Sequence, residues 1–120
     1  MSTLKVLVVD DDEIVCALLQ DLLTKQGHQV NTYSDAQRGL AAAGKQAFDL
    51  VLLDIRMPVL NGIEVLKKMR PQLPKARFVM ITASPEDELV GDAFSSGATL
   101  CLSKPIDPQK VNELLSILFA

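Results

Sequence analysis

The chain has 120 residues, of which 48% are hydrophobic and 22% charged, and its formal net charge at pH 7 is −3. This length fits one domain with its own core, and an acidic balance without a basic stripe argues against direct nucleic-acid binding. Acidic residues appear by Asp10 and no apolar run approaches the ~18 residues of a membrane span, so neither a signal peptide nor a membrane segment is predicted. We therefore expect a cytoplasmic protein in which Cys16 and Cys101 are reduced core residues.

The chain begins with an apolar strand, predicted from Leu4 to Val9, that runs directly into Asp10-Asp11-Asp12. A helix is predicted from Asp12 to a cap at Gly27, because apolar residues recur at helical spacing. The recurring residues are Ile14, Leu18 and Leu22, together with Val15, Leu19 and Leu23. Gln29 to Tyr33 predicts a weak second strand.

The next helix is predicted to open with a capping box of Ser34 and Gln37 and to end at Gly44. A third strand follows from Leu50 to Leu53. Its apolar residues do not alternate with polar ones, which is typical of a parallel strand covered on both faces. The strand ends in an acid, Asp54, and an acid at that position starts no helix.

A proline and a glycine between Met57 and Gly62 predict a loop there, so Asp54 is expected at the exit of the third strand. After the loop, a helix is predicted to run to Arg70 and to stop at Pro71.

The fourth strand is predicted from Phe78 to Ile81 and ends at Thr82. Ser84-Pro85 and Asp87 predict the start of the next helix, with a capping side chain and a proline in its first turn. Gly97 is expected to close that helix.

The last strand is predicted from Thr99 to Ser103 and leads into Lys104-Pro105. Asp107-Pro108 repeats the cap-and-proline start and predicts a final helix. Its apolar stripe is formed by Val111, Leu114, Leu115 and Leu118.

Five strands alternating with five helices predict an α/β fold, a doubly wound five-stranded parallel sheet of the flavodoxin-like type with strand order 2-1-3-4-5. In that order the first and third strands are neighbours at the topological switch point, where such folds bind ligands. Four of the five strands end in, or lead into, polar residues that this edge would collect: Asp10, Asp11, Asp54, Thr82 and Lys104.

Carboxylates held together at that edge are expected to take up a cation. Two carboxylates about 4 Å apart repel by about 4 kcal/mol at an effective dielectric of about 20, and oxygen ligands in an open crevice favour Mg²⁺ over Ca²⁺. Simpler interpretations exist for some of these residues. Asp12 is needed to cap a helix, Thr82 alone is an ordinary strand residue, and Lys104 alone could be a surface lysine.

The run that closes in Asp54, followed by Met57-Pro58 and Gly62, resembles the receiver domain of two-component response regulators, chemotaxis regulators among them. The resemblance covers nearly the whole chain, so 1–120 is expected to be one receiver domain. It implies that Asp54 accepts a phosphoryl group from a sensor histidine kinase or a histidine phosphotransfer protein. Thr82 and Lys104 would then contact the phosphoryl group and switch the surface around the fourth helix, fifth strand and fifth helix. Such a domain is a signalling phosphoacceptor that catalyses only its own phosphorylation and dephosphorylation.

The same resemblance implies a Mg²⁺ site in which Asp11 and Asp54 bind the ion directly and Asp10 acts largely through water. The backbone carbonyl of Arg56 would supply a further oxygen, while the Arg56 side chain is expected to be solvated. It also implies a cis peptide bond at Lys104-Pro105. His28 is expected at the surface.

Two features depart from the family pattern or extend it. Where the family carries an aromatic residue three positions before the lysine, this chain has Cys101, so we expect the output signal to pass through backbone movement between Thr82 and Pro85. Ile117 and Phe119 flank the stripe of the last helix and cannot all be buried with it. The remaining apolar area is predicted to pack on a second copy or on a downstream effector domain.

Two alternative functions are compatible with parts of the pattern. A haloacid-dehalogenase-like phosphohydrolase would use Asp10 as its nucleophile, with Asp12, Thr82 and Lys104 in support, but it leaves Asp54 unexplained. A degenerate receiver would act only as an interaction module and would have lost its affinity for Mg²⁺.

Overall fold

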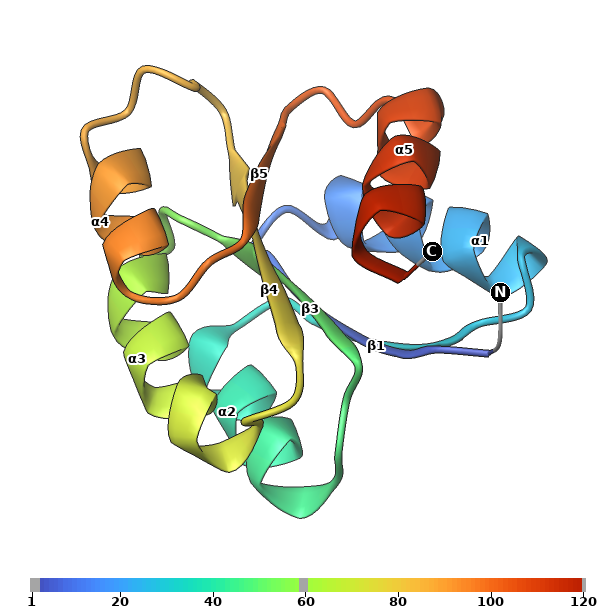
Figure 1. Cartoon of the computed structure of the whole chain (residues 1–120), viewed down its shortest axis with the longest axis horizontal. Coiled ribbons are helices and arrows are strands. Elements are labelled where there is room, and N and C mark those ends of the chain that lie inside the picture. The colour runs from blue at the N-terminus through green and yellow to red at the C-terminus, as the bar shows by residue number, and fades with distance from the viewer. Residues whose placement is uncertain (1–2, 59–60, 120) are drawn as a thin grey trace.

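A computed structural model describes residues 3–58 and 61–119 of the chain. Five parallel strands form one sheet in the order β2-β1-β3-β4-β5, with helices on both faces (Figure 1). The strands are β1 (Lys5–Val9), β2 (Gln29–Tyr33), β3 (Leu50–Asp54), β4 (Arg77–Thr82) and β5 (Leu100–Ser103). The helices are α1 (Glu13–Lys25), α2 (Ala36–Lys45), α3 (Gly62–Gln72), α4 (Leu89–Ser95) and α5 (Pro108–Phe119). The predicted fold class and strand order are confirmed.

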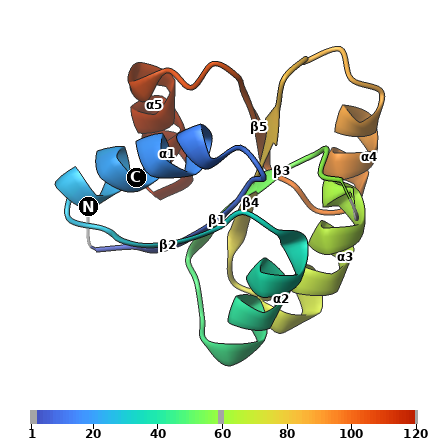
Figure 2. The ribbon, with the colours of Figure 1, turned by 180° about the vertical axis from the view of Figure 1, so that it is seen from behind.

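The sheet separates two hydrophobic layers. Seen from behind, α1 and α5 lie on one side of the sheet, and α2, α3 and α4 lie on the other (Figure 2). Along β1, Leu7 faces the layer under α2 and α3, whereas Val6 and Val8 face the layer under α1 and α5. Both faces of this strand are therefore buried, which explains why its apolar residues follow one another without polar alternation.

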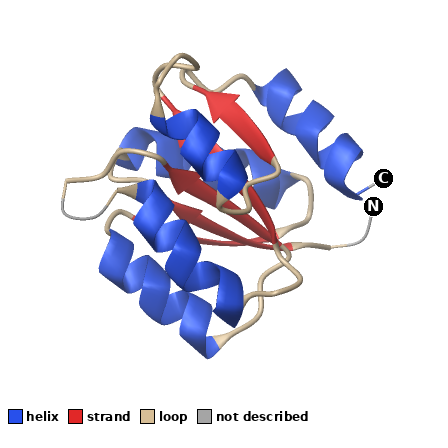
Figure 3. Ribbon diagram, turned by 60° about the vertical axis from the view of Figure 1, so that its left-hand side comes forward, coloured by secondary structure: helices blue, strands red, loops and turns tan. Residues whose placement is uncertain are grey.

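The carboxyl ends of the strands meet at one edge of the sheet because the strands are parallel (Figure 3). Val9 at the end of β1 pairs with Leu53, and Asp54 pairs with Ile81 near the end of β4. Thr82 pairs in turn with Ser103 at the end of β5. Residues that are far apart in the sequence thus lie side by side at the carboxyl ends of neighbouring strands.

Several predicted helix ends are confirmed. The Asp12 carboxylate accepts hydrogen bonds from two backbone amides in the first turn of α1, and Gly27 follows that helix with a φ of 91°. Asp107 likewise accepts from the Gln109 amide at 2.9 Å, and Gly97 closes α4 with a φ of 117°. A positive φ favours glycine because a Cβ would be strained there.

The predicted start of α2 is wrong by one residue. Asp35, not Ser34, caps the helix, because its Oδ1 accepts a hydrogen bond from the Arg38 amide at 2.8 Å. Gly44 lies inside the helix, which continues to Lys45. A capping carboxylate adds a negative charge at the helix N-terminus, where the backbone dipole stabilises it.

Two further helix ends differ from the prediction. Helix α3 continues past Pro71 to Gln72, and the Leu73 amide still donates to the Met69 carbonyl at 2.9 Å. A proline so near the end removes only one backbone hydrogen bond. Helix α4 begins at Leu89 rather than beside Pro85, because the preceding residues form a turn in which the Asp87 amide donates to the Ser84 carbonyl at 3.1 Å.

His28 is buried, contrary to the expectation of a surface position. Its side chain is 6% exposed and its Nδ1 accepts a hydrogen bond from the Leu4 amide at 3.0 Å. Burial lowers the pKa of His28 from its ordinary value of 6.5. The neutral imidazole therefore joins the residue before β2 to the residue before β1.

Both cysteines are free; Cys16 is buried and Cys101 half-buried. At the last helix, Leu118 and Phe119 pack against the core, which leaves Ile117 at 70% exposure. Among the residues that the structure describes, no helix combines the length and the hydrophobicity needed to cross a membrane.

Candidate functional site: an acidic cluster beside a lysine

Three carboxylates meet where β1 and β3 leave the sheet. Asp10 and Asp11 follow β1, and Asp54 is the last residue of β3. One oxygen from each lies within 4.8 Å of the others. Asp10 and Asp54 are buried whereas Asp11 is exposed, so the cluster has a buried floor and an open side. The structure thus brings together the three acids singled out in the sequence.

A lysine from the other end of the chain points into this cluster. The Nζ of Lys104 lies 3.2 Å from Oδ2 of Asp10 and 3.5 Å from Oδ2 of Asp54. Lys104 follows β5, and its peptide bond to Pro105 is cis, as the family pattern implied. Thr82, buried at the end of β4, completes the set of polar residues at this edge.

The carboxylates carry more negative charge than the single ammonium balances. Burial and the neighbouring carboxyl of Asp10 raise the pKa of Asp54 to about 7, although Lys104 opposes the shift. For Lys104, burial works against the charged form, but the carboxylates of Asp10 and Asp54 outweigh it and raise the pKa of the ammonium. The excess negative charge of the cluster therefore favours binding of a cation.

The donor set fits a hard divalent ion. Oδ1 of Asp10 accepts from the Asp12 amide at 2.9 Å and from Lys104 at 3.3 Å. Its Oδ2 is buried and lies near the Lys104 ammonium, but within the described part of the chain it has no hydrogen bond of acceptable geometry. A buried carboxylate oxygen without a hydrogen bond is costly, and a metal ion or a water bound to it would satisfy that oxygen.

The Thr82 hydroxyl is engaged locally. Its Oγ1 donates to the Ser84 carbonyl at 2.8 Å and accepts from the Ser84 amide at 3.1 Å. The single hydroxyl proton is therefore committed to the loop that follows β4. A new acceptor at the site would have to compete with the Ser84 carbonyl for it.

The Arg56 side chain is 62% exposed, as expected, and it also forms an ion pair that was not predicted. Its Nε and Nη2 donate to the two carboxylate oxygens of Asp87 at 2.7 and 2.9 Å. Meanwhile its backbone amide donates to Oδ1 of Asp54 at 3.2 Å. The sequence did hold one signal for this pair, since the two opposite charges follow adjacent strands, β3 and β4.

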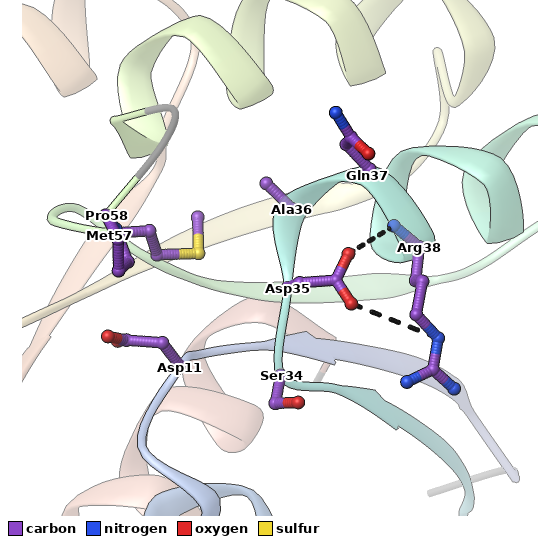
Figure 4. Close-up of a pocket in the computed structure, with 8 residues that line it drawn as sticks. All are labelled: Asp11, Ser34, Asp35, Ala36, Gln37, Arg38, Met57 and Pro58. Carbon is purple, nitrogen blue, oxygen red and sulfur yellow. Dashed lines mark hydrogen bonds and ion pairs between the residues drawn. The ribbon is translucent and has the colours of Figure 1, made fainter.

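Two pockets flank the acidic cluster. The first, of about 470 Å³, opens beside Asp11 and has Met57 and Ala36 on its apolar wall, while Asp35 is held by Arg38 (Figure 4). The second, also about 470 Å³, lies on the other side of the site. It is lined by Asp12, Ile14, Val15, Leu18, Ala83, Lys104, Pro105 and Ile106. The reactive edge is thus open to solvent on both flanks.

The chain is similar to known proteins over most of its length. The profile of the response regulator receiver domain matches residues 6–116. The alkaline phosphatase synthesis transcriptional regulatory protein PhoP of Bacillus subtilis is 40% identical over 110 residues, which cover 90% of this chain and 45% of that protein. The sporulation initiation phosphotransferase F of B. subtilis is 31% identical over 113 residues, covering 94% of this chain and 91% of that protein.

A solved structure of similar sequence has the same fold. The chemotaxis protein CheY4 of Vibrio cholerae superposes with a TM-score of 0.91 at 31% identity, covering 98% of this chain and all of that one. The fold and the acidic edge define a signalling domain of the α/β class. The chain belongs to the response regulator receiver domain family, the phosphoacceptor domains of two-component systems. The phosphohydrolase and the degenerate receiver are not favoured. The chain spans less than half the length of PhoP and of several other curated relatives.

Proposed function

We propose that Asp54 is the residue that accepts the phosphoryl group, and that 1–120 forms one receiver domain. The observation that carries this proposal is the convergence of Asp10, Asp11 and Asp54 within 4.8 Å, with the Lys104 ammonium 3.5 Å from Asp54. An Asp54 oxygen forms a bond to phosphorus while the bond from phosphorus to the donor atom breaks. The donor atom is the imidazole nitrogen of a phosphohistidine or the oxygen of an acyl phosphate, and it leaves with the electron pair.

Mg²⁺ is the ion that this donor set would hold. Asp11 and Asp54 would bind it directly, Asp10 largely through water, and the Arg56 carbonyl would add one oxygen. When bound, it supplies positive charge against the oxygens of the transferred group. The unsatisfied Oδ2 of Asp10 and the raised pKa of Asp54 support this assignment.

Lys104 and Thr82 act on the product. Lys104 balances charge on the phosphoryl oxygens, because its ammonium already lies between Asp10 and Asp54. Thr82 donates its hydroxyl proton to a phosphoryl oxygen once it leaves the Ser84 carbonyl. Because these groups are all in the chain itself, the domain catalyses its own phosphorylation and the loss of its phosphoryl group.

The partners are a sensor histidine kinase or a histidine phosphotransfer protein in the cytoplasm. A further contact of α5 with a second copy or a downstream effector domain is also proposed, and the exposed side chain of Ile117 would take part in it. Two of the similar proteins are transcriptional regulators several times longer than the matched segment. Any DNA contact would belong to such an additional domain, since this chain has a net charge of −3.

The test is phosphorylation by acetyl phosphate with Mg²⁺, followed by intact mass and by mapping of the modified residue. Wild type should gain one phosphoryl group on Asp54, and Asp54→Asn should gain none. Asp49→Asn is the matched control, because Asp49 precedes the same strand at its opposite end and, among the described residues, its carboxylate accepts a hydrogen bond only from the Lys5 amide. An adduct on Asp10 would support the phosphohydrolase instead and would refute the proposal.

A further inference from the structure

Asp87 lies at the junction of two hydrogen-bonded routes, one from Asp54 and one from Thr82. The first route runs through Arg56. Its amide donates to Asp54 at 3.2 Å, and its guanidinium donates to both oxygens of Asp87 at 2.7 and 2.9 Å. A bidentate pair fixes the relative orientation of its partners as well as their separation. The loop after β3 is thereby tied to the loop after β4.

The second route runs through the backbone after β4. The Ser84 carbonyl accepts from the Thr82 hydroxyl at 2.8 Å and from the Asp87 amide at 3.1 Å. If the Thr82 hydroxyl turns to a phosphoryl oxygen, the Ser84 carbonyl loses one of its two donors. This loss then affects the hydrogen bond from the Asp87 amide, which is the other donor to that carbonyl.

Asp87 also holds the start of α4. Its Oδ1 accepts from the Leu89 amide, the first residue of that helix, at 2.9 Å. Its side chain is only 11% exposed although the Arg56 side chain is 62% exposed. The Asp87 carboxylate therefore contacts the loop after β3 and the first turn of α4, while the Asp87 amide contacts the turn after β4.

In this chain, a signalling route through the position three residues before Lys104, where the family carries an aromatic residue, is weakened. The strand position that pairs with Met80 holds Cys101, a small side chain packed against the core. Its thiol has a pKa raised by burial. The side chain of Cys101 is too small to follow a movement of the Thr82 hydroxyl.

We propose that Asp87 is the residue through which the phosphorylation state of Asp54 reaches α4, with Arg56 as its positioning partner. The inference rests on the proposed role of Asp54. A contiguous chain of contacts counts as a signalling route only if its two ends respond together. Asp87 meets the structural condition because each route ends on the carboxyl group or the amide of that one residue.

The test compares amide chemical shifts in the full chain with and without beryllofluoride and Mg²⁺. In wild type, amides beside Asp54 and amides of α4 at Val90, Gly91 and Ala93 should all shift. Arg56→Gln and Asp87→Asn should each reduce the α4 shifts by about half or more, and the double variant should lose no more than either single variant. The asparagine keeps an oxygen for the Leu89 amide, so the helix start is preserved.

Two further variants separate signalling from simple loss of an ion pair. Arg56→Lys keeps the charge without the bidentate geometry and should restore the α4 shifts only partly. Lys25→Gln removes the exposed pair with Asp21, 3.1 Å apart on α1, and should leave them unchanged. If α4 shifts fully in Arg56→Gln and Asp87→Asn while the amides beside Asp54 also shift, the route through Asp87 is wrong and the phosphoacceptor proposal stands. If beryllofluoride shifts no amide beside Asp54 in wild type, the phosphoacceptor proposal itself fails.

Discussion

Replacing Gly62 by alanine should damage the site through the backbone alone. Gly62 is the first residue of α3, and its amide donates to the Ile55 carbonyl at 2.6 Å. A Cβ on Gly62 would overlap the carbonyl oxygen of Asp54 and lie 2.8 Å from Cα of Ile55. Ordinary carbon contacts begin at about 3.5 Å, so α3 must move away by a distance on the order of 1 Å.

The atoms in the way belong to the backbone, and no side chain can rotate to relieve the contact. Overpacking of this kind costs about 1–3 kcal/mol, and we expect the free energy of unfolding in urea to fall by that amount. A displacement of about 1 Å at a reacting group can cost up to about 10²-fold in rate. Phosphorylation by acetyl phosphate should therefore slow by about 10-fold or more.

Gly91→Ala is the matched control, because a Cβ there meets nothing within 4 Å inside α4. It should leave the phosphorylation rate unchanged and stabilise the fold by roughly 0.4–1 kcal/mol through lower chain entropy. If Gly62→Ala is as stable and as rapidly phosphorylated as Gly91→Ala, the close approach of α3 to the end of β3 is not what positions Asp54.

Lys104→Met should slow phosphorylation by about 10²-fold in the same assay, because one preorganised charge is lost; an unchanged rate would remove Lys104 from the mechanism. His28 has a pKa lowered from 6.5 by burial, so the unfolded chain binds a proton that the folded chain excludes. Stability should fall as the pH drops below about 6.5, by up to about 1.4 kcal/mol per pH unit. In urea titrations across pH, His28→Gln should lose this component; an identical pH profile would mean that His28 is protonated in the fold. Asp35→Ala should cost about 1 kcal/mol while Ser34→Ala stays within about 0.5; the reverse order in thermal unfolding would restore Ser34 as the cap.

The sequence predicted the sheet and the acidic cluster because their signals are strong and local. Leu50 to Leu53 is apolar without alternation, which few environments other than a doubly covered strand explain. Once parallel order is assumed, the residue after each strand must lie at one shared edge. The meeting of Asp10, Asp54 and Lys104 follows from topology, without any knowledge of side-chain conformation.

The predictions from the sequence were wrong where two local signals compete or where the hydrogen-bond partner is distant in the sequence. Ser34 and Asp35 are adjacent caps, and only the path of the chain out of β2 decides between them. Ser84-Pro85 carries a strong helix-start pattern, yet the turn closed by the Ser84 carbonyl displaces α4 to Leu89. His28 looked polar and exposed, but its partner is an amide 24 residues away, which no local pattern reveals.

Lys104 is delivered by β5, which lies at an edge of the sheet and hydrogen-bonds to β4. Segments with few buried contacts open most readily without global unfolding, and three of the four residues of β5 are only half-buried. If β5 frays, the ammonium withdraws while the three carboxylates stay in place at the ends of β1 and β3. Competence for phosphoryl transfer is then governed by a local opening equilibrium. Hydrogen exchange at the β5 amides would measure it, independently of the melting temperature of the whole domain.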